Sequence, residues 1–158
     1  MLVLTPMNDE LTGLFYVAEP SRRLRLLTMG YGLLIFIWLT PEDNTVWPVA
    51  LLGFGLALLS IIWLVQRRLG GSTFPAHYVP MSSALFGGTI GLSSALSSAG
   101  LMFFKNALHA HVFWDFPPGM VAAMLTRAPS WALAGGLAGL GVGCLWLWWK
   151  SASQSKSN

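Results

Sequence analysis

Long apolar stretches separated by short polar segments dominate the pattern along the chain. Four of these stretches are candidate membrane-spanning helices, at about residues 24–40, 46–66, 82–104 and 131–149. A hydrocarbon core about 30 Å thick takes about 20 helical residues, so the first stretch is short and needs flanking arginines that reach back to the headgroups. The pattern predicts an all-α integral membrane protein, a four-transmembrane-helix bundle of two helical hairpins.

Polar segments flank these spans. Residues 1–21 form an N-terminal arm outside the bilayer, for which a docked surface helix over 11–18 and an irregular conformation are equally expected. Asn8 or Asp9 would cap that helix. The Ser-rich residues 151–158 are predicted to be a disordered tail after the membrane domain.

The composition supports the membrane assignment. Apolar types make up 54% of the 158 residues and charged types 9%, against roughly 25% charged residues in an ordinary soluble domain. A soluble fold of this length needs more charge to cover its surface. The net charge of +3 comes from clusters beside apolar stretches, which act as topology signals, so no nucleic-acid partner is expected.

The basic residues predict the side on which each end lies. Cytoplasmic segments carry an excess of Lys and Arg. With both termini inside, seven basic residues lie on the inner side and two, Lys105 and Arg127, on the outer side. The inner set is Arg22, Arg23, Arg25, Arg67, Arg68, Lys150 and Lys156. We therefore expect a multi-pass protein in contact with membrane lipid, with both termini cytoplasmic.

Small residues recur at every fourth position in the last two spans. The ladders are Ser83, Gly87, Gly91, Ala95 and Ala99 in the third span, and Gly135, Gly139 and Gly143 in the fourth. Residues four apart share one helix face, and a face without bulk lets two helix backbones approach closely. These positions are predicted to be helix-packing sites, against each other or against a partner. An alternative is that the serines of the third span line a substrate path.

The segment between these spans holds most of the polar chemistry of the outer side. Lys105, His109, His111, Trp114 and Asp115 are candidates for contact with a cofactor or a partner. Residues 119–128 are predicted to form a short amphipathic helix, started by the preceding proline, in the headgroup layer. We favour interfacial side chains bonded to backbone, lipid or a partner. The alternatives are a metal site, which would need a third ligand, and a haem or chlorophyll held by His109.

Three sequence segments resemble small multi-span thylakoid proteins of cyanobacteria and chloroplasts. They are 46–53 (Val-Trp-Pro-Val-Ala-Leu-Leu-Gly), 107–118, and 127–131 (Arg-Ala-Pro-Ser-Trp). The resemblance implies a subunit or assembly factor of a photosynthetic or respiratory membrane complex. It also implies a thylakoid or bacterial plasma membrane, with the termini on the stromal or cytoplasmic side.

No enzyme signature appears in the sequence, which lacks paired mid-membrane carboxylates, HExxH and GxSxG. We therefore expect a non-catalytic accessory subunit or assembly factor of a larger membrane complex, without a cofactor, acting by helix–helix contact through small-residue faces. Two alternatives are a small homo-oligomeric transporter or channel, and a pigment- or haem-binding protein that uses a histidine ligand.

Overall fold

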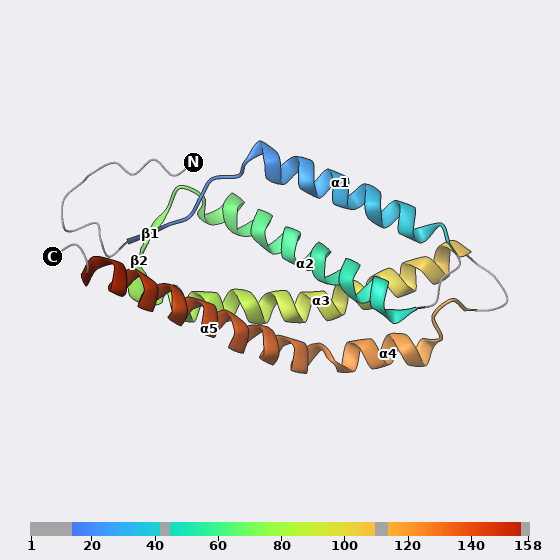
Figure 1. Cartoon of the computed structure of the whole chain (residues 1–158). Coiled ribbons are helices and arrows are strands. Elements are labelled where there is room, and N and C mark those ends of the chain that lie inside the picture. Colours follow the sequence, from blue (N-terminus) through green and yellow to red (C-terminus); the bar gives the residue numbers. More distant parts are fainter. Residues whose placement is uncertain (1–13, 42–44, 110–113, 156–158) are drawn as a thin grey trace.

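The computed structural model describes residues 14–41, 45–109 and 114–155 and is mostly helical (Figure 1). This confirms the all-α class. The helices are α1 (Arg22–Leu39), α2 (Val46–Leu69), α3 (Val79–His109), α4 (Pro118–Thr126) and α5 (Ala128–Ser155), preceded or linked by the short strands β1 (Leu14–Tyr16) and β2 (Thr73–Pro75) and the 3₁₀ turn η2 (Ala76–Tyr78).

Among the residues that the structure describes, three helical segments are long and apolar enough to cross a membrane. They are Val46–Leu69, Ala76–His109 and Pro118–Ser153, and they contain the second, third and fourth predicted spans. The first predicted span, residues 24–40, falls on α1, which is not among them. Arg22, Arg23 and Arg25 all lie within the 18 residues of α1, and charged side chains are costly in a bilayer. Three candidate spans are therefore the finding, and a fourth is a proposal taken up below.

α3 is the central helix of the structure. α5 runs antiparallel along one side of α3 and α2 along another, while α1 lies beyond α2 (Figure 1). Seven buried apolar residues form a core where α2, α3 and α4 meet, away from the β strands: Val49, Leu52, Ala99, Leu101, Met102, Phe116 and Met124. α3 is thus the helix on which the rest of the bundle packs.

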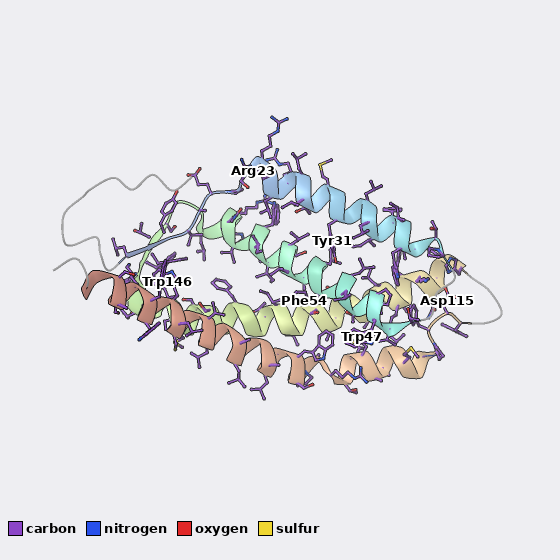
Figure 2. The ribbon with its side chains drawn as sticks, in the orientation of Figure 1. Arg23, Tyr31, Trp47, Phe54, Asp115 and Trp146 are labelled. Carbon is purple, nitrogen blue, oxygen red and sulfur yellow. The ribbon has the colours of Figure 1, made fainter. Side chains whose placement is uncertain are left out.

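α1 contacts the bundle through a few side chains, of which Tyr31, Ile35 and Trp38 pack against the core. Ser21 caps the helix, because its hydroxyl accepts a hydrogen bond from the backbone nitrogen of Leu24 at 3.2 Å. Most apolar side chains of α1 are exposed, including Phe36 at 71%. Tyr31 points toward α2 (Figure 2) and donates its hydroxyl to the carbonyl oxygen of Leu52 at 2.7 Å. An added Cβ at Gly55 would collide with the Tyr31 hydroxyl, so Gly55 provides the space for this contact.

The surface helix that the sequence allows over 11–18 is wrong for the part that the structure describes. β1 is extended and pairs antiparallel with β2, with Phe15 opposite Phe74. Beyond the strands, the backbone nitrogen of Val17 donates to Ser72 at 3.1 Å. Pairing with a strand nearly sixty residues away is favoured over a local helix here, because the backbones of both strands gain hydrogen bonds. Asn8 and Asp9 lie outside the described residues.

The predicted disorder of residues 151–158 is wrong for 151–155, which continue α5. Ser151 donates its hydroxyl to the carbonyl oxygen of Leu147 at 3.0 Å, and Ser153 to that of Trp149 at 2.9 Å. These bonds to the preceding turn satisfy the serine hydroxyls within the helix. Residues 156–158 lie outside the described part of the chain.

Candidate functional site

The two small-residue ladders lie against each other, at the contact between α3 and α5. A Cβ added to Gly87 would lie 2.1 Å from the carbonyl oxygen of Gly135, and one added to Gly135 would lie 2.2 Å from that of Gly87. A Cβ at Gly91 would lie 2.0 Å from the carbonyl oxygen of Trp131. Backbone meets backbone at these positions, so the absence of a side chain is required there.

The contact continues toward the end of the bundle that carries the strands. A Cβ at Gly139 would lie 2.0 Å from the carbonyl oxygen of Ser83, and one at Gly143 would lie 2.6 Å from Cα of Pro80. The sequence left open whether these glycines pack within the chain or against a partner, and in the structure they pack within the chain. α5 of the same chain covers the ladder of α3, so these residues hold the two helices together.

The ladder of α3 changes partner along its length. Ala95 and Ala99 are buried, and Ala99 belongs to the core with α2 and α4. α2 approaches α3 at Gly53, where an added Cβ would lie 2.7 Å from the backbone nitrogen of Ser98. α3 therefore packs tightly on two sides, with α5 near its start and with α2 farther along.

The serines of α3 contribute to this second contact. Ser94 and Ser98 are fully buried. Ser98 donates its hydroxyl to the carbonyl oxygen of Ser94 at 2.8 Å, while the Ser94 hydroxyl has no hydrogen-bond partner among residues 14–41, 45–109 and 114–155. A conduction route along these two hydroxyls would require α2 and α3 to separate.

A groove of about 470 Å³ runs between α2, α3 and α5. Phe54 and Leu58 of α2 form one wall, with Phe54 labelled in Figure 2, and Val142 lies on the α5 side. Small residues line the rest of the groove: Gly87, Gly91, Ser94, Ala134, Gly135, Ala138 and Gly139, together with Ile90 and Trp131. The groove exposes the edge of the glycine contact and includes the unbonded Ser94 hydroxyl.

At the opposite end of α3, Asn106 attaches the segment that precedes α4. Its side-chain nitrogen donates to the carbonyl oxygen of Phe116 at 2.7 Å, and its side-chain oxygen accepts from the Phe116 backbone nitrogen at 2.9 Å. Phe116 is fully buried as a result. α4 then begins with Pro118 at its first position, which agrees with the predicted proline-started helix at 119–128.

His109 and Asp115 meet one turn farther along. The Nδ1 atom of His109 lies 2.5 Å from Oδ2 of Asp115, and both side chains are largely buried. Asp115 marks this end of the bundle in Figure 2. A carboxylate bonded to one ring nitrogen fixes the orientation of the imidazole. The pair joins the end of α3 to the segment before α4, beside the Asn106 contact.

Lys105 is fully buried next to this pair, which is unusual for a lysine. Its Nζ atom lies over the ring of Trp38 of α1, 4.6 Å from the centroid, and 5.8 Å from the centroid of Phe116. Cation–π attraction offsets part of the cost of removing the ammonium from water. Lys105 thereby connects three parts of the chain: α1, α3 and the segment before α4.

Trp114 does not join this cluster, since it is 60% exposed. His111 lies outside the described residues. Within the described ranges, no three His, Cys, Asp or Glu side chains gather as metal ligands. The described geometry of this end is one of attachment between helices.

The basic residues predicted to set the topology lie at one end of the bundle. α1 begins there with Arg22, Arg23 and Arg25, α2 ends there with Arg67 and Arg68, and Lys150 lies near the end of α5 (Figure 1). Two of them contact aromatic rings. The guanidinium carbon of Arg67 lies 4.9 Å from the Trp63 ring centroid, and Nζ of Lys150 lies 5.1 Å from that of Trp146. Lys105 and Arg127 lie toward the other end.

Comparison of the chain with protein-family models, curated proteins and solved structures finds no match.

Three positions that matter in the structure were not singled out from the sequence as packing or attachment residues. Gly53 is the close contact between α2 and α3, Asn106 holds Phe116, and Tyr31 joins α1 to α2. The sequence gives a weak indication at Gly53, since a second small residue, Ala57, follows four positions later. Both residues are buried in the structure. There is no such indication at Asn106 and Tyr31, because their partners are backbone groups of distant residues.

Proposed function

We propose that this protein is a non-catalytic accessory subunit or assembly factor of a larger membrane protein complex, of the photosynthetic or respiratory kind, and that it binds its partner by helix–helix contact. In this proposal α1 is a fourth span, both termini are cytoplasmic or stromal, and the glycine contact between α3 and α5 makes a rigid frame. The partner binds to a face of that frame.

The groove between α2, α3 and α5 is the observation that carries this proposal. Its small residues allow an outside helix to approach the frame closely, as small-residue faces do in membranes. Phe54 and Leu58 provide an apolar wall. The Ser94 hydroxyl is buried and has no hydrogen-bond partner among the described residues, so it can donate to the partner once its side chain turns toward the groove. Since lipid is as apolar as leucine, shape and hydrogen bonding distinguish a helix from lipid there. The occupant is a transmembrane helix of the partner.

Substitution within the groove tests this function. Ala138→Leu adds bulk inside the groove, and Gly141→Leu adds comparable bulk on the same helix where nothing lies within 4 Å of an added Cβ. After gentle solubilisation of the native membrane, wild-type protein and Gly141→Leu should migrate with a large complex in native electrophoresis. Ala138→Leu should migrate alone at normal abundance. A wild-type chain that runs alone or as a small homo-oligomer would refute the function.

The topology has its own test. The positive-inside rule supports the proposal, because the end with the arginine clusters carries most of the basic residues. In a Cys144→Ser background, a membrane-impermeant maleimide should label Ala123→Cys of α4 from the outer side of sealed vesicles. Ser151→Cys should react only after the vesicles are opened. Labelling of both positions from one side of sealed vesicles shows that α5 does not cross the membrane and contradicts the proposed topology.

A further inference from the structure

A second cavity lies at the basic end of the bundle, about 500 Å³ in volume. Three distant parts of the chain enclose it: β1 with the residues after it, the last turns of α2, and the segment from β2 to the first turns of α3. The pairing of β1 with β2 closes one side. The cavity therefore exists because of the tertiary structure, and no single segment forms it.

The walls of the cavity are almost entirely apolar. Five aromatic side chains line it, and all are partly exposed, from 37% for Phe74 and Phe86 to 57% for Tyr16; the other two are Phe15 and Tyr78. Aliphatic side chains of α2, such as Ile62 and Val65, complete the lining. An apolar occupant would cover rings that residues 14–41, 45–109 and 114–155 leave partly exposed.

Gln66 is the one amide side chain in this wall. Its side-chain oxygen is buried and has no hydrogen-bond partner in the part of the chain that the structure describes. A buried acceptor without a donor is costly. Because this oxygen is shielded from solvent, the Gln66 side chain must turn toward the cavity before a hydroxyl group of the occupant can bond to it.

Positive charge lies beside the cavity. Arg67 and Arg68 follow Gln66 directly in the last turn of α2, and both are exposed. The three arginines at the start of α1 lie at the same end, and Arg23 projects away from the bundle (Figure 2). Of the acidic residues that the structure describes, Glu19 lies near this end, against Gly71, and Asp115 lies at the other. An anionic group is favoured here.

The size of the cavity is that of a site for a small molecule. It lies within the roughly 300–1,000 Å³ of small-molecule sites. Basic pockets at the cytoplasmic ends of transmembrane helices bind anionic lipid headgroups.

We propose that this cavity binds one anionic glycerolipid, with an acyl chain among the aromatic side chains and the headgroup at Arg67 and Arg68. A headgroup with both a negative charge and hydroxyl groups matches the arginines and the Gln66 oxygen together. The lipid fills the space between β1, α2 and α3 and so stabilises the attachment of the strands to the bundle. This site adjoins the groove for the partner helix, because Ile90 lines both.

Lipid retention after purification tests the proposal. The full chain is reconstituted in phosphatidylglycerol or in phosphatidylcholine, re-extracted in mild detergent and examined by native mass spectrometry. Wild-type protein should retain one phosphatidylglycerol at least tenfold more often than phosphatidylcholine. Equal retention of the two lipids, or retention of neither, overturns the proposal without reference to any variant.

Two variants locate the lipid. Ser82→Trp fills the cavity from its α3 wall, while Leu85→Trp places the same side chain on the same helix at a residue that is 65% exposed and outside the lining. Ser82→Trp should lose the retained lipid and Leu85→Trp should keep it, with equal helix content by circular dichroism. The double variant Arg67→Gln/Arg68→Gln should retain lipid but lose the tenfold preference. Lipid retention by Ser82→Trp at the wild-type level overturns the assignment to this cavity.

Discussion

A single methyl group should have opposite effects on stability at Gly87 and Gly100 of α3 and little effect at Gly88. At Gly87, the Cβ of an alanine would lie 2.1 Å from the carbonyl oxygen of Gly135, where ordinary contact begins at 3.4 Å, so α3 and α5 would have to separate by about 1.3 Å. At Gly88, the nearest atom to an added Cβ is the carbonyl oxygen of Ala132 at 3.4 Å, which is ordinary contact. Gly100 has nothing within 4 Å of an added Cβ.

The expected magnitudes follow from these distances. Alanine in place of an exposed helical glycine stabilises a helix by up to about 1 kcal/mol. Gly100→Ala should therefore raise the free energy of unfolding, and Gly88→Ala should leave it unchanged or raise it slightly. Gly87→Ala should lower it by about 1–3 kcal/mol, the usual cost of overpacking, because the obstacle is backbone that cannot rotate away.

Unfolding in mixed micelles of sodium dodecyl sulfate and a mild detergent measures these differences. Circular dichroism follows the loss of helix content across the transition. The three variants differ from wild type by the same methyl group on the same helix. If Gly87→Ala and Gly100→Ala shift the unfolding midpoint in the same direction, the backbone contact between α3 and α5 does not exist in the folded protein.

Other residues permit further tests of the same structure. Tyr31→Phe removes the hydroxyl that bonds to α2 and should lower the free energy of unfolding by about 1 kcal/mol. Proteolysis near α1 should then be faster than in wild type. An unchanged rate would show that other contacts hold α1. Asn106→Leu leaves the buried backbone groups of Phe116 without hydrogen bonds and should lower the free energy of unfolding in micelles by about 1–3 kcal/mol. Wild-type stability of this variant would contradict the attachment of α4 through Asn106. Gly53→Ala should destabilise the bundle while Gly30→Ala, with open space around its Cβ, should not; equal stability of the two variants excludes close contact between α2 and α3.

Much of the helical architecture could be predicted from the sequence because it depends on local patterns. Uninterrupted apolar stretches and the prolines that limit them indicate helices wherever the chain packs, and the spans at 46–66, 82–104 and 131–149 each fall inside a described helix. The spacing of Gly87 and Gly135 within their ladders also identified faces that admit close approach. These properties follow from covalent geometry and side-chain size.

The pattern was less informative where local and distant interactions compete. Nothing near Phe15 in the sequence indicates a strand, because the hydrogen-bonding partner of β1 is β2. The serines at 151–153 suggest disorder by composition, yet they bond within α5. The apolar length of residues 24–40 suggested a span, although the arginines of α1 keep it out of the set of clear candidates.

The sequence by itself determined that the chain is helical and apolar, where its charges gather, and which helix faces are free of bulk. Only the tertiary structure decided that the glycines of α3 meet those of α5, that Gly53 meets Ser98, and that β1 closes a cavity at the basic end. The physical reason is that a helix face of small residues permits another backbone to approach closely but does not select which backbone it is. That choice depends on the summed contacts of all helices at once, which no local pattern contains.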